Sequence, residues 1–189
     1  MAGGVILCVG AGRCGLMSMV HVLNQQPDVG ASLREPPILP WARGAASTVI
    51  ADRIRRMRKS RPMPWVADAA PFYLPYLEDA IAAEPGVRIV GLRRSCDEVV
   101  ASYCRWFDDL FCLPMNHWAK EPPPGWHHDP IWTQSFPQYD TKDRSQGLRR
   151  YWHEYYETLD DLARRHPETI RVFEMDATLN TEAGQRARP

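Results

Sequence analysis

The hydrophobic and polar positions of this chain fall into short segments that alternate between strand and helix patterns. Residues 5–9 form an apolar run of strand length, and residues 16–23 place apolar side chains at helical spacing. The same reasoning predicts further strands at 29–33, 65–67, 87–92 and 170–173, and helices at 40–61, 74–83, 95–110 and 146–165. Strands that alternate with helices favour an α/β fold, in which a central, mostly parallel sheet carries helices on both faces.

Residues 10–18 join the first strand to the first helix and form the most informative stretch of the sequence. Three glycines, Gly10, Gly12 and Gly15, fall within six positions. A glycine turn between a strand and a helix lets backbone N–H groups converge on an anion, and the helix N-terminus adds partial positive charge. The stretch is therefore a candidate nucleotide- or anion-binding loop. The alternative is a tight turn that binds nothing.

Two nucleotide-binding motifs fit this loop. Gly10-x-Gly12-x-x-Gly15 is the complete dinucleotide fingerprint G-x-G-x-x-G. The same residues match the first half of the phosphate-loop pattern G-x-x-x-x-G-K-[ST], but Leu16 and Met17 replace its Lys and Ser/Thr. Without that Lys and the Mg²⁺-binding hydroxyl, the loop is not expected to handle a metal-bound γ-phosphate.

A second basic site is predicted where the clearest of the later strands ends. Arg93 and Arg94 follow this strand, and Ser95-x-x-Glu98 forms a capping box that places a helix start directly after them. Arg94 would then lie at the mouth of the sheet. Ser102, on the same helix, would face the same way.

Residues 113–143 differ from the rest of the chain because they are rich in Pro, Trp, His and Tyr and show no periodicity. A connection of this length usually serves a function. We predict that it is a lid or acceptor-binding loop within a single domain spanning residues 1–189. The helix that follows, at 146–165, is predicted to bury its apolar stripe in the core.

Composition and charge exclude several classes of protein. The net charge is +0 and the pI is about 7.0, so no global field favours nucleic acid or a membrane. No apolar run is long enough to span a bilayer, and the N-terminus lacks the basic start of a signal peptide. The five cysteines include no C-x-x-C pair, which favours reduced thiols in a cytoplasmic protein. His117, His127 and His128 lack a partner pattern, so no metal site is predicted.

Two segments together resemble the sulfotransferase family that uses 3′-phosphoadenosine 5′-phosphosulfate (PAPS). Residues 10–15 resemble the family's 5′-phosphosulfate loop, with Arg13 at the position of its basic residue. Arg94 at a strand end and Ser102 eight positions later (94 + 8 = 102) resemble its 3′-phosphate motif. The resemblance implies a P-loop-like, three-layer α/β/α fold. It assigns cofactor binding to Gly10, Ala11, Gly12, Arg13, Cys14, Gly15, Leu16, Met17, Ser18, Arg94 and Ser102.

A third segment, residues 26–35, is similar to the carbohydrate-type members of this family, in which a glutamate at the position of Glu35 is the general base. The implied reaction moves a sulfuryl group from PAPS to a hydroxyl of a carbohydrate or small-molecule acceptor and leaves adenosine 3′,5′-bisphosphate. Glu35 would accept the hydroxyl proton, and Arg13 would stabilise the charge that develops on the transferring group. The reaction needs no metal.

The chain also departs from the family pattern. Residues usual in the family are replaced at Cys14, Leu16, Met17, Ala69, Ser95 and Cys96. In the first loop these replacements leave backbone amides, Arg13 and Ser18 as donors. The family's Gly/Arg-rich C-terminal cofactor loop has no clear counterpart before Pro189, so a truncated chain or a reduced nucleotide clamp is expected.

Two other functions stay open on the residues alone. A NAD- or FAD-binding Rossmann oxidoreductase would use the glycine fingerprint, and Glu35 lies 20 residues after Gly15 (35 − 15 = 20), near the place of a ribose-binding acid. That alternative leaves Arg94 and Ser102 unexplained. The other is a non-catalytic, P-loop-like nucleotide-binding module, because fold alone does not separate such a module from an enzyme.

Overall fold

The computed structural model describes residues 3–41, 47–111, 114–127 and 129–175. Its centre is a five-stranded parallel sheet with the strand order β2-β3-β1-β4-β5. The strands are β1 (Gly4–Val9), β2 (Val29–Leu33), β3 (Trp65–Ala69), β4 (Arg88–Arg93) and β5 (Ile170–Glu174). Because the strands are parallel, their carboxyl ends share one edge of the sheet, and this edge is where open α/β sheets bind ligands.

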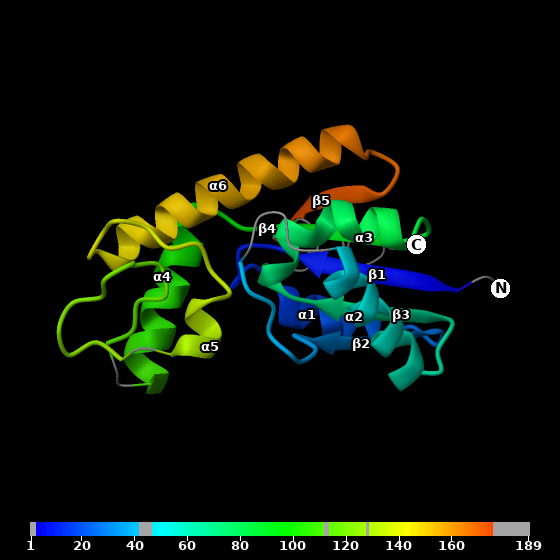
Figure 1. Ribbon diagram of the computed structural model, residues 1–189, viewed down its shortest axis with the longest axis horizontal. Helices are drawn as coiled ribbons and strands as arrows, with labels where there is room; N and C mark the ends of the chain where they lie inside the picture. The colour runs from blue at the N-terminus through cyan, green and yellow to red at the C-terminus, as the bar shows by residue number, and fades with distance from the viewer. Residues whose placement is uncertain (1–2, 42–46, 112–113, 128, 176–189) are drawn as a thin grey trace.

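Helices cover both faces of this sheet and extend beyond it (Figure 1). They are α1 (Leu16–Leu23), α2 (Ser47–Ser60), α3 (Leu77–Ala83), α4 (Cys96–Trp106), α5 (Pro130–Thr133) and α6 (Arg144–Arg165). A 3₁₀ turn, η1 (Pro71–Tyr76), precedes α3, and a π turn, η2 (Phe107–Phe111), follows α4. None of the helices in the described ranges is long and apolar enough to cross a membrane.

The apolar sequence of β1 follows from its burial on both faces. Val5 and Leu7 pack in a core with residues of α2, α3 and α6, whereas Cys8 packs on the opposite face with Leu16 and Met19 of α1. A strand at the centre of a parallel sheet has no face left for water, so it reads as a continuous apolar run. The result is three layers, with α1 on one side of the sheet and α2, α3 and α6 on the other.

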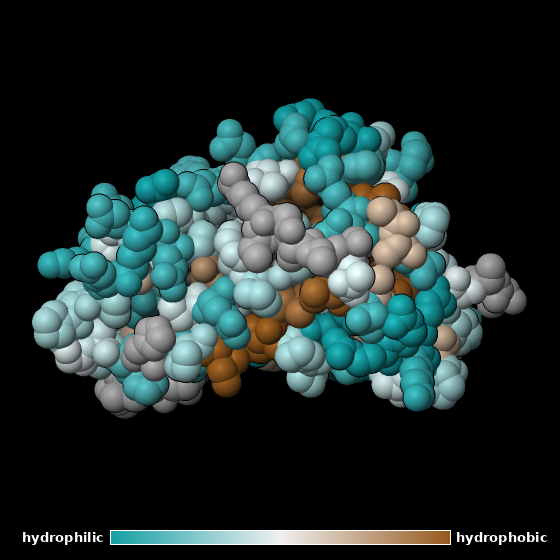
Figure 2. Space-filling model, viewed as in Figure 1, coloured by the Kyte–Doolittle hydropathy of each residue, from teal (hydrophilic) through white to brown (hydrophobic). Residues whose placement is uncertain are grey.

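The carboxyl edge of the sheet faces a lobe built from α4, α5 and the chain between them (Figure 1). Helix α6 runs from this lobe across to β5 and so ties the lobe to the sheet. Hydrophilic side chains cover most of the face shown in Figure 2, and hydrophobic ones show between the lobe and the sheet. The junction of lobe and sheet is therefore the candidate location of a ligand site.

The predicted α/β fold with a parallel sheet is confirmed, and each predicted strand lies within two residues of an observed one. The helix predicted from residue 40 is observed from Ser47; residues 40 and 41 are not helical, and 42–46 lie outside the described ranges. The helix predicted at 74–83 is divided. Its first part is the 3₁₀ turn η1, because Pro75 has no N–H for an α-helical hydrogen bond.

The strand order bears on the dinucleotide alternative. β3 lies between β1 and β2, since it pairs in parallel register with both. In the usual dinucleotide-binding order the second strand is the direct neighbour of the first, which brings its terminal acid to the ribose. Here β2 lies two strand spacings from β1, about 10 Å. Glu35 is therefore not held beside Gly15 as that alternative requires.

Candidate functional site

A cavity of about 470 Å³ opens at the carboxyl edge of the sheet, between the sheet and the lobe. Its size is typical of small-molecule sites. The glycine loop, the ends of β2 and β4, helix α4 and the 114–136 segment all contribute to its wall. Its lining includes Gly12, Arg13, Arg34, Arg94, Ser102, Tyr103, Asp129, Trp132 and Phe136.

At two positions, the backbone of the glycine loop adopts a conformation that favours glycine over other residues. Gly12 and Gly15 have φ values of 82° and 95°, in the left-handed region. Gly12 also lies against Tyr103, because a Cβ placed there would be 2.0 Å from the Tyr103 hydroxyl oxygen. That hydroxyl donates a hydrogen bond to the Ala11 carbonyl at 3.2 Å. Tyr103 on α4 therefore fixes the path of the loop.

The predicted loop residues divide into two groups. Gly12, Arg13, Gly15, Leu16, Met17 and Ser18 line the cavity, whereas Gly10, Ala11 and Cys14 lie buried beneath it. The Gly10 and Ala11 N–H groups donate to the hydroxyls of Tyr155 and Tyr156, at 2.9 and 3.4 Å. These two amides are therefore directed to α6 rather than to a ligand. The apolar stripe of α6 predicted a helix packed in the core, but it gave no sign that the tyrosines of this helix support the loop.

Cys14 is a buried, neutral thiol under the loop. Burial raises its pKa to about 11, although the Gly12 N–H and the Tyr156 hydroxyl lower it in part. Its sulfur packs closely against Gly10, because a Cβ placed on Gly10 would lie 2.4 Å from the Cys14 Sγ. Cys14 therefore packs the underside of the loop and carries no negative charge at neutral pH.

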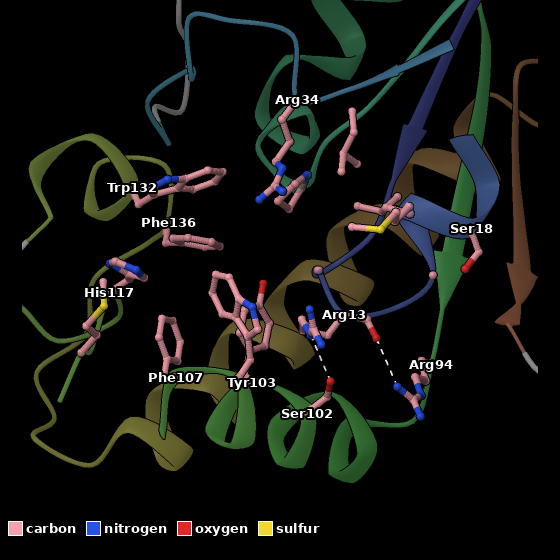
Figure 3. A pocket seen from close by; sticks show the side chains of 18 of the residues that line it. Arg13, Ser18, Arg34, Arg94, Ser102, Tyr103, Phe107, His117, Trp132 and Phe136 are labelled. Carbon is pink, nitrogen blue, oxygen red and sulfur yellow. Dashed lines mark hydrogen bonds between the residues drawn. The ribbon is translucent and has the colours of Figure 1, made fainter. Parts of the chain in front are cut away.

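Arg13, Arg94 and Ser102 come together at one side of the cavity (Figure 3). Arg13 Nε donates to Ser102 Oγ at 3.0 Å, and Arg94 Nη1 donates to the Arg13 carbonyl at 3.4 Å. Arg94 also pairs with Glu98 at 3.3 Å. Its Nε is buried and has no hydrogen-bond partner among the described residues. Two separate sequence motifs thus present their cationic groups to the same space, and a buried donor remains unsatisfied.

Helix α4 starts where the capping box predicts, directly after Ser95. The serine side chain does not cap the backbone of the helix; its hydroxyl donates to Glu98 at 2.7 Å instead. Arg94 follows β4 immediately, and Ser102 lies two turns along α4 on the buried side. The strand end and the helix thereby hold Arg94 and Ser102 on the side of the cavity that carries Arg13.

Glu35 is not among the residues that line the cavity. Its carboxylate pairs with Arg61, and its backbone N–H donates to both carboxylate oxygens of Asp68, at 3.2 and 3.1 Å. Burial raises the pKa of Glu35, but the hydrogen bond and charge of Arg61 outweigh it and the net shift is downward. Glu35 is therefore ionised at neutral pH, and its role as a general base stays a prediction.

The residue before it, Arg34, lines the cavity and was missed by the sequence analysis. Its φ is 57°, in the left-handed region, which costs a non-glycine residue about 1–3 kcal/mol. Strand patterning assigns residues to two faces of a sheet but does not anticipate such a turn after the strand. The chain therefore directs Arg34 rather than Glu35 into the cavity.

The 113–143 segment contributes Met115, His117, Asp129, Trp132 and Phe136 to the cavity wall. It contains the short helix α5, and His117 Nδ1 lies 3.1 Å from Thr133 Oγ1. Trp118, by contrast, is 0% exposed and packs against Phe136 and Tyr103, with ring centroids 4.9 and 5.2 Å apart. One side of the segment is thus core and the other is cavity wall. Residues 112, 113 and 128 lie outside the described ranges.

The described residues hold no group of three or more His, Cys, Asp and Glu side chains arranged to bind a metal ion. Residues 176–189, in which the sequence shows no clear counterpart of the Gly/Arg-rich cofactor loop, lie outside the described ranges.

Comparison with known proteins assigns no family to this chain. No family model matches this chain, and no curated protein matches it. Among solved structures, the chain is similar to the solution NMR structure of a de novo designed P-loop fold protein, with 14% identity and a TM-score of 0.33. That match covers 84% of this chain and 96% of the designed protein. We conclude that this chain has a P-loop-like α/β fold, on the evidence of its own strand order and glycine loop.

Proposed function

We propose that this chain is a PAPS-dependent sulfotransferase, which transfers a sulfuryl group to a hydroxyl of a carbohydrate or small-molecule acceptor. The observation that carries the proposal is the convergence of Arg13, Arg94 and Ser102 on one side of the cavity. Both motifs of the family resemblance meet there, although 81 residues separate Arg13 from Arg94. The proposal includes a cytoplasmic location, which the reduced cysteines of the sequence favour.

The residues of the cavity suit a ligand with two anionic ends. Arg94 would hold the 3′-phosphate with its guanidinium, whose Nε lacks a partner among the described residues. Ser102 would add a hydroxyl donor beside it. Arg13 and the first turn of α1, at Leu16–Leu23, would hold the 5′ end. When bound, PAPS would supply the activated sulfuryl group.

The proposed reaction gives a role to two side chains. Arg13 would neutralise negative charge on the transferring group, because a preorganised cation stabilises charge that develops in the transition state. Glu35 would take the proton of the acceptor hydroxyl, which requires its carboxylate to leave Arg61. Leu16 and Met17 occupy the places of the Mg²⁺-associated residues of a phosphate loop, so the proposal assigns no step to a metal.

Calorimetric titration of the purified chain with four nucleotides tests the proposal. We expect adenosine 3′,5′-bisphosphate to bind at least ten-fold more tightly than adenosine 5′-phosphate, ATP or NAD, because only the first offers a 3′-phosphate to Arg94. A preference for NAD would overturn the proposal in favour of the dinucleotide alternative. Equal affinity for the bisphosphate and the monophosphate would remove its 3′-phosphate site.

A pair of substitutions tests Glu35 as the base. Glu35→Gln keeps the shape but removes the proton acceptor, so we expect turnover to fall about 10²–10⁴-fold with unchanged nucleotide affinity. Arg61→Gln breaks the same ion pair but leaves the carboxylate in place. It should retain turnover within a few-fold. Sulfate transfer to a panel of hydroxyl acceptors measures both, and equal losses in the two variants would show that only the ion pair matters.

A non-catalytic nucleotide-binding module is the second candidate. One observation favours it, namely that the Glu35 carboxylate is bound to Arg61 outside the cavity. The two candidates share the nucleotide and differ in the reaction. Tight binding of adenosine 3′,5′-bisphosphate without sulfate transfer to any acceptor in the panel would support the module.

A further inference from the structure

Arg34 is held in place by its backbone rather than by a partner for its charge. Its N–H donates to the Ala69 carbonyl at 3.0 Å, and the next N–H, of Glu35, donates to the buried carboxylate of Asp68. Asp68 in turn accepts hydrogen bonds from Ser32 and Tyr73, at 2.6 and 2.5 Å. The left-handed turn at Arg34 is therefore fixed on both sides, and it aims the side chain into the cavity.

The Arg34 side chain lies on an aromatic ring of the opposite element. Its guanidinium carbon is 5.0 Å from the centroid of the Trp132 ring, and Phe136 lies next to that ring (Figure 3). No carboxylate of the described residues forms an ion pair with Arg34. A guanidinium stacked on a ring keeps its N–H edges free for a planar acceptor such as a carboxylate. Arg34, held against Trp132, therefore offers free N–H donors to an anion in the cavity.

The charges of the cavity wall leave Arg34 without a counterpart. The charged lining residues are Arg13, Arg34, Arg94 and Asp129, a balance of 3 − 1 = +2. Asp129 is engaged as the cap of α5, because its carboxylate accepts from the N–H groups of Ile131 and Trp132 at 3.0 and 3.1 Å. The proposed nucleotide would use Arg13 and Arg94. Arg34 approaches from the other side of the cavity, at the end of β2 (Figure 3).

We propose that Arg34 and Trp132 form an acceptor subsite that selects hydroxyl compounds carrying a carboxylate. This inference rests on the proposed function, because it assigns the opposite side of the cavity to the nucleotide. Arg34 would bind the carboxylate through two N–H groups, and Trp132 and Phe136 would pack against the body of the acceptor. The acceptor would then lie on the Arg34 side of the cavity, and Glu35, the next residue along the chain, would have to leave Arg61 to reach it.

Matched probes that differ only in charge test the subsite. 4-Hydroxyphenylacetate and 4-hydroxyphenylacetamide form an aromatic pair, and glucuronate and glucuronamide form a sugar pair. Each is titrated into the full chain by ligand-observed NMR, with and without saturating adenosine 3′,5′-bisphosphate. We expect at least one carboxylate to bind ten-fold or more tightly than its amide. The pair that shows the preference identifies an aromatic or a sugar acid as the source.

Substitutions then assign the preference to Arg34. Arg34→Gln should bring the affinity ratio of acid to amide close to one, and Arg34→Lys should keep part of it. Arg105→Gln removes one positive charge from an exposed position of α4 and should leave the ratio unchanged. Retention of the wild-type melting temperature and nucleotide affinity by Arg34→Gln separates loss of the subsite from misfolding.

Two results would overturn the subsite. One is equal binding, or no binding, of acid and amide in both pairs by the wild-type chain. The other is an acid preference that survives in folded Arg34→Gln. Neither depends on the nucleotide, because the titrations without it stand alone. Failure of adenosine 3′,5′-bisphosphate to bind, with the acid preference intact, would reject the proposed function and leave the anion subsite.

Discussion

Arg94→Ala is expected to weaken binding of adenosine 3′,5′-bisphosphate by about 10- to 150-fold and to leave adenosine 5′-phosphate within a few-fold. The loss of a charge-assisted hydrogen bond costs about 1.5–3 kcal/mol, which corresponds to that range. Among the described residues, the Arg94 guanidinium has only long contacts, to the Arg13 carbonyl at 3.4 Å and to Glu98 at 3.3 Å, so it is available to a ligand. Calorimetric titration with the two nucleotides measures the difference.

The neighbouring arginine supplies the control. Arg93 does not line the cavity; it pairs with Asp160 and lies 4.8 Å from the Tyr156 ring. Arg93→Ala should therefore change the two affinities by the same factor, through the support of the loop by Tyr156. A selective loss of the bisphosphate in Arg93→Ala, or an equal loss of both nucleotides in Arg94→Ala, would contradict the assignment of the 3′-phosphate site.

Gly12→Ala is expected to destabilise the fold by about 2–5 kcal/mol and to weaken adenosine 3′,5′-bisphosphate at least ten-fold. A left-handed backbone costs alanine about 1–2 kcal/mol. Overpacking adds about 1–3 kcal/mol, because the new Cβ would lie 2.0 Å from the buried Tyr103 hydroxyl. Gly125→Ala is a matched control with φ of 86° and open space around the Cβ. It should cost about 1–2 kcal/mol and leave nucleotide affinity unchanged.

A double-mutant cycle isolates the contact with Tyr103. Tyr103→Phe removes the hydroxyl, after which the nearest ring atom lies 3.0 Å from the position of the Cβ. Gly12→Ala should then cost less in the Tyr103→Phe background than in the wild type, by about 1 kcal/mol or more. Urea unfolding measures each corner of the cycle. Equal costs of Gly12→Ala and Gly125→Ala in the wild type would mean that backbone strain alone matters.

Local sequence patterns were sufficient to predict the strands, most of the helices and the two phosphate-type motifs. Apolar periodicity is a local property, so it located the strands and the helix after the glycine loop within a few residues. Glycine spacing and the capping box are also local, and they placed Arg13 at a loop and Arg94 at a strand end. The meeting of Arg13 with Ser102 followed from parallel strands, whose carboxyl ends share one edge.

The set of side chains that enters the cavity depends on tertiary contacts and could not be predicted from local patterns. β3 inserts between β1 and β2, and this order depends on packing that no local pattern records. Because the backbone makes a left-handed turn at Arg34, the Arg34 side chain enters the cavity, whereas the Glu35 side chain pairs with Arg61. Arg34 and Glu35 both follow the second strand in the sequence; the hydrogen bonds from the Glu35 N–H to Asp68, 33 positions away, fix which of the two side chains faces the cavity.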